Sequence, residues 1–192
     1  MQIGFYFDQS RCTGCYACLI ACKDWHEYSL GTEPQNWIRL TAVERGKFPD
    51  LCLSYLFITC LHCADPPCIP ACPAVAITKR GEDGIVVVDR DACLGSMGCD
   101  GFCKAACPYD ALQFGPEPDA KAQKCDLCLE RWTRKKKPVC VEACPMRALD
   151  AGPLNELKVT HGDIQEAEGF THFEKVKPSI IFKSRRQGIP SS

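Results

Sequence analysis

The sequence predicts an α+β fold made of small sheets and short helices, and three observations support it. First, 17 of the 192 residues are cysteine, while hydrophobic residues make up 46% and charged residues 24%. Second, the apolar stretches are short and several of them directly precede a group of cysteines. Third, a six-residue pattern beginning Cys-Pro occurs three times, which marks a duplicated unit. The chain is therefore expected to be organised around its cysteines rather than around one large apolar core.

Short strands are expected where apolar or β-branched runs lead into the cysteine groups. These predicted strands cover residues 3–7, 53–58 and 85–88. The polar segment between Ile77 and Ile85 contains two glycines and predicts the turn of a hairpin. Short helices are predicted directly after Cys18 and over residues 127–134.

Two stretches lack cysteine groups, an insertion over residues 25–51 and an extended C-terminal tail over residues 150–192. The insertion contains four large aromatic residues: Trp25, Tyr28, Trp37 and Phe48. These rings have two alternative roles, either capping the core or docking a larger subunit, because aromatic residues are enriched at interfaces. The tail is expected to dock a partner as well.

Charge and hydropathy exclude several classes of protein. The formal net charge is −1, which gives no electrostatic basis for nucleic acid as a partner. The basic run at 131–137 is expected to be a solvated loop or a partner contact. The longest apolar stretch has 11 residues, at 51–61, whereas a membrane-spanning helix needs roughly 20. The first residues show no signal-peptide pattern.

The cysteines fall into four quartets, with Cys52 left over. The quartets are Cys12, Cys15, Cys18 and Cys22; Cys60, Cys63, Cys68 and Cys72; Cys93, Cys99, Cys103 and Cys107; and Cys125, Cys128, Cys140 and Cys144. In every quartet three residues separate the third cysteine from the fourth. Because Cys52 lies in an apolar strand context, it is expected to be a buried structural thiol.

This spacing is typical of iron-sulfur ligands. Three thiolates in one loop can hold three corners of a 4Fe-4S cluster, and in two-cluster ferredoxins the fourth cysteine, followed by proline, ligates the other cluster. The repeated pattern C-P-x-x-A-[IL] begins at Cys72, Cys107 and Cys144, at offsets of 35 and 37 residues. The first quartet departs from it, since Lys23 follows Cys22.

Disulfides and zinc are the competing explanations for so many cysteines. Disulfide frameworks are typical of small secreted chains with an even cysteine count, whereas this count is odd. Zinc prefers two separated pairs of ligands, which suits only the fourth quartet taken alone. The four histidines, His26, His62, His161 and His172, show no paired metal spacing, and His62 is expected to fill the loop between Cys60 and Cys63.

No constellation for chemistry on a substrate is present in the sequence, such as a nucleophile elbow, a phosphate-binding loop or a dinucleotide fingerprint. Several clusters in one chain suit the conduction of single electrons, with potentials tuned by the surroundings of the sulfur atoms. We therefore expect a non-catalytic electron-transfer subunit.

The four quartets, with the phrases KCDLC from Lys124 and ACPMRAL from Ala143, resemble the four-cluster iron-sulfur subunit of the dimethyl sulfoxide reductase family over about residues 1–150. The resemblance implies two interleaved bacterial-type ferredoxin-like units, each with two 4Fe-4S clusters. Residues 1–24 and 121–149 would form the first unit, with quartets one and four. Residues 52–120 would form the second unit, with quartets two and three.

The resemblance also implies crosswise ligation, with every fourth cysteine serving a neighbouring cluster. The implied ligands are Cys12, Cys15, Cys18 and Cys144 for cluster 1; Cys125, Cys128, Cys140 and Cys22 for cluster 2; Cys60, Cys63, Cys68 and Cys107 for cluster 3; and Cys93, Cys99, Cys103 and Cys72 for cluster 4. The third quartet is unusual because an insertion places Ser96 where a second ligand ordinarily falls and supplies Cys99 instead. Cys99 is expected to ligate, with a 3Fe-4S cluster or an altered potential as the alternative.

Two hypotheses about function follow. In the first, the chain belongs to a hetero-oligomer and carries electrons between a molybdenum or tungsten bis-pterin catalytic subunit, facing clusters 1 and 2, and a membrane anchor or other carrier, facing clusters 3 and 4. In the second, it is a free polyferredoxin or the electron-input subunit of a hydrogenase or formate-hydrogen lyase assembly. The complex is expected to be peripheral to the cytoplasmic membrane or cytoplasmic.

Overall fold

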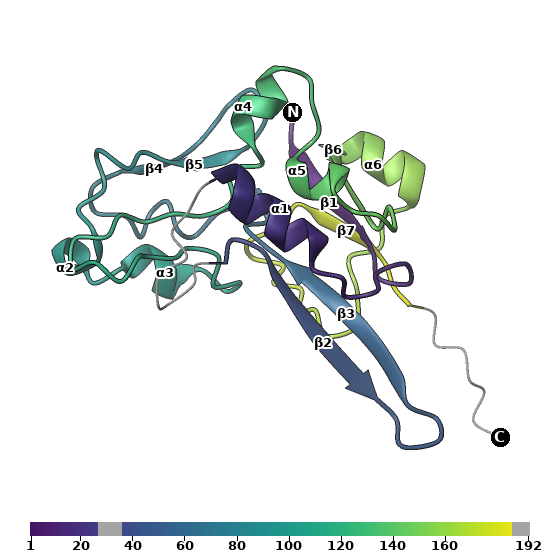
Figure 1. Cartoon of the computed structure of the whole chain (residues 1–192). Coiled ribbons are helices and arrows are strands. Elements are labelled where there is room, and N and C mark those ends of the chain that lie inside the picture. Colours follow the sequence, from purple (N-terminus) through teal and green to yellow (C-terminus); the bar gives the residue numbers. More distant parts are fainter. Residues whose placement is uncertain (27–35, 186–192) are drawn as a thin grey trace.

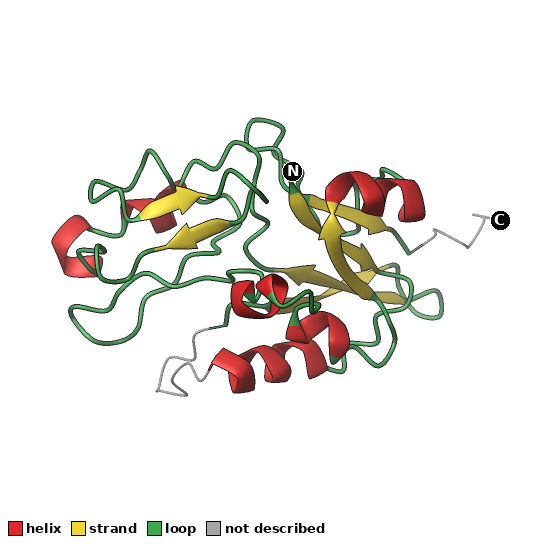
Figure 2. Cartoon of the chain, turned by 90° about the horizontal axis from the view of Figure 1, so that it is seen from above, coloured by secondary structure: helices red, strands yellow, loops and turns green. Residues whose placement is uncertain are grey.

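The computed structural model describes residues 1–26 and 36–185, which form two groups of elements and a projecting hairpin. One group is a three-stranded sheet with nearby helices, and the other is a short hairpin with two small helices at the far end of the molecule (Figure 1). Between them the chain runs largely as loops, as the view from above shows (Figure 2). This mixed arrangement of small sheets and short helices confirms the predicted fold class.

The three-stranded sheet joins segments from both ends of the chain. Its central strand, β1 (Ile3–Asp8), is antiparallel to β6 (Leu149–Pro153) and parallel to β7 (Ile180–Lys183). All six residues of β1 are buried, as expected for a central strand covered on both faces, and α6 (Leu154–His161) packs against the sheet. The strand predicted at 3–7 is thus confirmed, and part of the segment 150–192 completes the sheet.

Two hairpins supply the other strands. In the first, β4 (Ile77–Lys79) pairs with β5 (Val86–Val88), which confirms the predicted hairpin. In the second, β2 (Arg39–Arg45) pairs along its full length with β3 (Cys52–Ile58) and projects from the body (Figure 1). The sequence analysis predicted β3 but not β2, because β2 is largely exposed and charged and carries little apolar signal.

The helices are short. They are α1 (Ala17–His26), α2 (Ser96–Cys99), α3 (Phe102–Ala106), α4 (Leu129–Thr133) and α5 (Val139–Glu142). The helix expected after Cys18 is confirmed as α1, whereas the one predicted over 127–134 was too long. Leu127 and Cys128 have positive φ angles of 60° and 48°, so the helix begins only at Leu129. In the described part of the chain, no helix is long and apolar enough to cross a membrane.

The aromatic residues of the insertion differ in their surroundings. Trp37 packs against the main core and donates a hydrogen bond from Nε1 to Oε1 of Gln123 at 3.2 Å. Phe48 is 94% exposed, and Trp25 is 43% exposed beneath the guanidinium of Arg131. Tyr28 lies outside the described residues. Trp37 therefore caps the core, while docking by the exposed rings stays a prediction.

Cys52 is half-buried, so the expectation of a buried thiol was wrong in degree. It begins β3 and pairs with Arg45, the last residue of β2 before the hairpin turn. Cys52 therefore lies near the turn of the projecting hairpin rather than at the end that joins the core. The strand context predicted for Cys52 is correct.

Candidate metal centres

The three Cys-Pro repeats form the same turn. In each repeat the N–H of the fourth residue donates to the carbonyl oxygen of the cysteine at 3.1 Å. That fourth residue has a positive φ every time, 53° at Val75, 46° at Asp110 and 51° at Arg147. The turn reverses the chain and aims the next N–H, from the alanine of the repeat, back toward the cysteine.

Two of these alanines donate directly to sulfur. The distance from N of Ala111 to Sγ of Cys107 is 3.4 Å, and from N of Ala148 to Sγ of Cys144 it is 3.3 Å. Backbone N–H groups aimed at a thiolate stabilise its negative charge and tune the potential of a cluster that it holds. In these two repeats the turn therefore places a backbone N–H within hydrogen-bond distance of the cysteine sulfur.

The strained residue of the first repeat provides a prediction about stability. A β-branched side chain at positive φ is an outlier that costs about 1–2 kcal/mol, whereas asparagine tolerates this conformation. Because Val75 is 72% exposed, little packing opposes the change. We expect Val75→Asn to stabilise the holoprotein by about 1 kcal/mol, measured as a raised thermal midpoint under anaerobic conditions.

The matched control is Val159→Asn, since Val159 is also highly exposed but lies in α6. There asparagine should leave the thermal midpoint nearly unchanged, because valine and asparagine have similar helix propensities. Equal effects of the two substitutions would show that the turn at Val75 is not strained.

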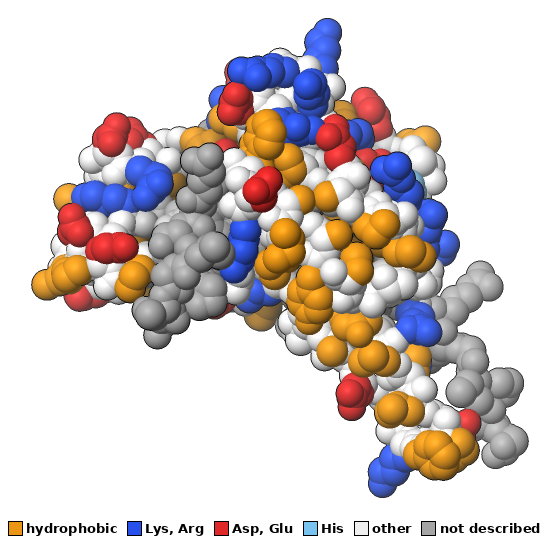
Figure 3. Space-filling view, in the orientation of Figure 1, with side chains coloured by type: hydrophobic (Ala, Val, Ile, Leu, Met, Phe, Trp, Pro, Cys, Tyr) orange, Lys and Arg blue, Asp and Glu red, His pale blue; other side chains and the backbone are white. Residues whose placement is uncertain are grey.

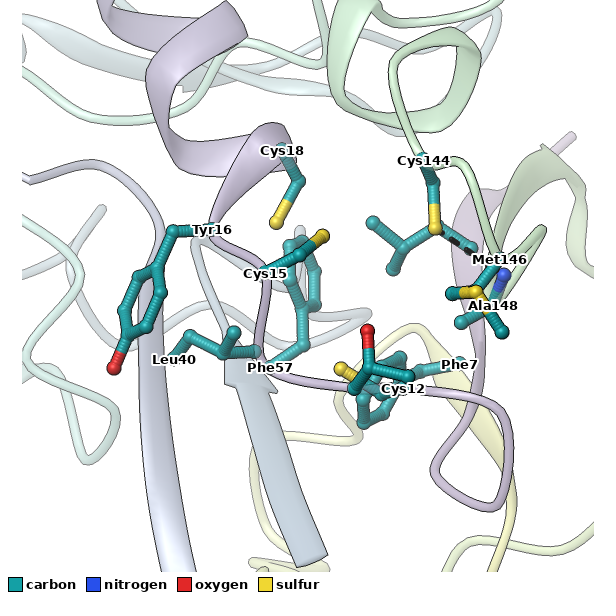
Figure 4. Close-up of a pocket in the computed structure, with 12 residues that line it drawn as sticks. Phe7, Cys12, Cys15, Tyr16, Cys18, Leu40, Phe57, Cys144, Met146 and Ala148 are labelled. Carbon is teal, nitrogen blue, oxygen red and sulfur yellow. Dashed lines mark hydrogen bonds between the residues drawn. The ribbon is translucent and has the colours of Figure 1, made fainter.

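The first set of thiols surrounds one pocket (Figure 4). Cys12, Cys15 and Cys18 come from the loop between β1 and the start of α1, and Cys144 faces them from the loop before β6. Apolar side chains complete the lining, among them Phe7 and Phe57. Gly14 allows the loop to turn with a φ of +69°, and a Cβ there would lie 2.3 Å from the ring of Tyr55.

A second pocket is lined by Cys72, Cys93, Cys99 and Cys103. Cys99 ends α2, which begins at Ser96, and its Sγ donates to the carbonyl oxygen of Gly95 at 3.3 Å. The inserted residues form this short helix, and the helix brings Cys99 to the pocket wall. All four thiols expected for cluster 4 are thus gathered, although they span two quartets.

The remaining two sets of thiols are identified by the cysteines that lie close enough to one member of each set to raise its pKa. Burial raises the pKa of Cys63 to about 12, and repulsion by Cys60, Cys107 and Cys68 adds to the rise. Burial likewise raises the pKa of Cys125 well above its usual value, with further contributions that include three other thiols: Cys22, Cys140 and Cys128. The sixteen cysteines therefore gather into four groups, each with three thiols from one quartet and one from another.

These groups suit soft, positively charged metal centres. Burial raises the pKa of most of the thiols, so ionising four of them in one apolar site needs compensating positive charge. Iron in a cluster supplies that charge and prefers thiolate ligands. The donor sets therefore fit 4Fe-4S clusters.

Two histidines lie beside these groups of thiols. His26 has Nε2 within 3.5 Å of Sγ of Cys128 and 3.9 Å from a carboxylate oxygen of Asp126, so these three residues could by geometry hold a separate ion. Cys128 is close enough to Cys125 and Cys140 to contribute to the raised pKa of each, so His26 lies beside a thiol of this group. His62 is fully buried between Cys60 and Cys63, as expected for a loop filler.

The comparison with protein families agrees with this chemistry. Two family models described as 4Fe-4S dicluster domains match the chain, one over residues 51–154 and one over residues 11–76. A component of the anaerobic dimethyl sulfoxide reductase of Escherichia coli K12 is 40% identical, over 99% of this chain and 92% of that protein. The chain belongs to the iron-sulfur subunits of the dimethyl sulfoxide reductase family.

Two less similar relatives match as well. A subunit of the sulfite dehydrogenase of Allochromatium vinosum is 34% identical, with 81% of this chain and 70% of the relative covered. Protein NrfC of Escherichia coli K12 is 36% identical, with 81% and 67% covered. As a family member, the chain is an iron-sulfur electron-transfer subunit of an oxidoreductase complex, carries multiple 4Fe-4S clusters and works in a hetero-oligomer.

Proposed function

We propose that the chain relays single electrons through four 4Fe-4S clusters between a molybdenum or tungsten bis-pterin catalytic subunit and a membrane anchor or other electron carrier. The observation that carries the proposal is the convergence of sixteen cysteines, most of them buried, into four groups. Each bound cluster would accept or release one electron with little rearrangement. The chain's own part is to hold the thiolates, exclude water and fix the order of the groups.

The pairing of strands supports two interleaved ferredoxin-like units. β1 precedes the first quartet and pairs with β6, which follows the fourth quartet, and α1 packs against α5. Similarly, β4 follows the second quartet and pairs with β5, which precedes the third. Because each sheet joins the quartets whose thiols converge, the topology supports crosswise ligation. The pocket offers four thiols including that of Cys99, which favours a 4Fe-4S over a 3Fe-4S cluster at that site.

The surface suggests where electrons enter and leave. Cys15 is exposed, and next to it Tyr16 and Met146 line the first pocket and are 45% and 40% exposed. A band of hydrophobic side chains runs from the region of α1 along the β2–β3 hairpin to its tip, where Phe48 lies (Figure 3). Apolar surface around an exposed cluster ligand suits a partner with a redox centre of its own. We assign this face to the catalytic subunit.

The second pocket has an apolar surround of its own. Leu94 lines that pocket, and with the neighbouring Met97 and Phe102 it is more than half exposed. These residues lie near α2 and α3, at the opposite end of the molecule from α6 and β7 (Figure 1). This end would meet the membrane anchor or other carrier and place the chain at the membrane periphery.

Metal content of the complex tests the proposal. We expect the natively tagged protein, purified without oxygen, to contain roughly 16 irons per copy of this chain, plus those of its partners. Stoichiometric molybdenum or tungsten should accompany them. The same iron without either metal would favour a free polyferredoxin, and zinc in place of iron would contradict the proposal.

A further inference from the structure

Three lysine ammonium groups donate hydrogen bonds to backbone carbonyl oxygens of cysteines in the four groups. The Nζ···O pairs are Lys79 with Cys63 at 3.1 Å, Lys121 with Cys93 at 2.7 Å and Lys124 with Cys125 at 3.0 Å. Lys124 differs from the other two in burial, because it is only 4% exposed whereas they are half-buried. A fully buried lysine is rare unless it is paired with negative charge.

The first residue of β5 fixes the position of the Lys124 ammonium. The carbonyl oxygen of Val86 accepts a second hydrogen bond from Nζ of Lys124. The N–H of the same residue donates to Nδ1 of His62 at 3.0 Å, and His62 lies between Cys60 and Cys63. The ammonium is thus anchored to Cys125, which belongs to one group of thiols, and to a strand that contacts the loop of another group.

Lys124 lies close to members of both groups. Burial raises the pKa of Cys68 to about 12 and repulsion by Cys60 contributes, whereas attraction by the Lys124 ammonium acts in the opposite direction. Cys68 belongs to the expected ligands of cluster 3, and Cys125, whose carbonyl accepts the hydrogen bond, belongs to those of cluster 2. Lys124 therefore lies at the junction between the two units.

The negative charge that offsets this buried cation is expected to come from the clusters. Within residues 1–26 and 36–185, no carboxylate forms an ion pair with Lys124. Burying an ammonium group without a counter-charge is costly, and two carbonyl dipoles offset only part of that cost. A cluster held by four thiolates is anionic and gains another negative charge on reduction, so a fixed cation stabilises the reduced form more than the oxidised form.

We propose that the buried Lys124 ammonium raises the reduction potentials of the two clusters between which it lies. The reduced form of these clusters, at the junction of the two units, is thereby favoured. This inference rests on the proposed assignment of four clusters. Lys124 is a positioning residue, since it acts on the clusters through the electric field of its charge and not as a ligand.

Potentiometric titration of the anaerobically purified complex, followed by electron paramagnetic resonance, tests the inference. We expect Lys124→Met to lower two midpoint potentials, each by about a tenfold change in the reduction equilibrium, which is about 59 mV for a one-electron couple. Lys124→Arg should retain both potentials because the charge is kept. Lys121→Met should shift a single midpoint that Lys124→Met leaves unchanged, and Lys175→Met, at an exposed site, should shift none.

Other outcomes would overturn the inference. Unchanged midpoints in Lys124→Met, or a shift of only one, would remove the bridging role while the four-cluster proposal stood. Lys124→Gln keeps a hydrogen-bond donor for the carbonyls, so loss of iron from this variant as well as from Lys124→Met would assign Lys124 to cluster assembly. Fewer than four one-electron couples in the unaltered complex would contradict the four-cluster proposal itself, and the inference with it.

Discussion

Cys144→Ala is expected to remove one cluster and to abolish electron transfer through the complex. Cys144 is the single thiol that reaches the first pocket from the far end of the chain, opposite three thiols of the first quartet. Without it one iron corner has no ligand, so about four of roughly 16 irons should be lost. Iron analysis and electron paramagnetic resonance would show the loss. Assays from reduced donor to terminal substrate would show activity falling by at least about 100-fold, since loss of an outer-shell partner of a metal ligand alone can cost that much.

Cys52→Ala is the matched control for this prediction. Cys52 is the one cysteine outside the four groups, and its half-buried thiol lies at the end of the β2–β3 hairpin. Iron content, all resonance signals and activity should stay unchanged in this variant. Loss of iron from Cys52→Ala, or full iron content in Cys144→Ala, would contradict the assignment of ligands.

A second comparison separates crosswise from local ligation. Cys140 and Cys144 are four residues apart, yet the thiols that raise the pKa of Cys140 most are Cys128 and Cys22, ahead of Cys18, whereas Cys144 lies in the pocket with Cys12. Cys140→Ala and Cys144→Ala should therefore remove different resonance signals. Loss of the same signal from both variants would mean that each quartet holds its own cluster and that the units are not interleaved.

The four cysteine quartets were predictable from spacing in the sequence, whereas their crosswise grouping was implied by the resemblance to the dimethyl sulfoxide reductase family. The strands before the cysteine loops were also predictable, since buried runs such as that of β1 carry a strong apolar signal. The turn made by each Cys-Pro repeat is a local structure, which is why three similar sequences fold alike.

Other features depend on contacts between distant segments. β2 was missed because its exposed, charged residues are held by pairing with β3 rather than by their own preference. Lys124 looked like an ordinary lysine in a motif until the structure showed its ammonium buried against Val86, 38 residues away along the chain. The burial of a charge cannot be derived from spacing alone, because it depends on which other segments cover it.

Removal of the iron is expected to unfold the described chain. The main core contains cysteines beside its aliphatic and aromatic side chains, and the second core is built largely around Cys68, Cys93 and Cys103. A structural metal site contributes about 10 kcal/mol or more in small zinc domains, which compares with a total of about 5–15 kcal/mol for a typical domain. Without clusters, four groups of buried thiols would be left as poorly packed cavities.

Chelation after mild oxidation provides the measurement. Far-ultraviolet circular dichroism should lose most of its signal, and tryptophan emission should shift to longer wavelength as Trp37 and Trp132, both packed against the main core, enter water. Reconstitution with iron and sulfide under reducing conditions should restore both signals, which excludes irreversible damage. An iron-free protein that kept its circular dichroism and its tryptophan emission would show that the apolar contacts suffice for folding. In that case the clusters would occupy a preformed scaffold, and their contribution to stability would be no more than that of ordinary bound ligands.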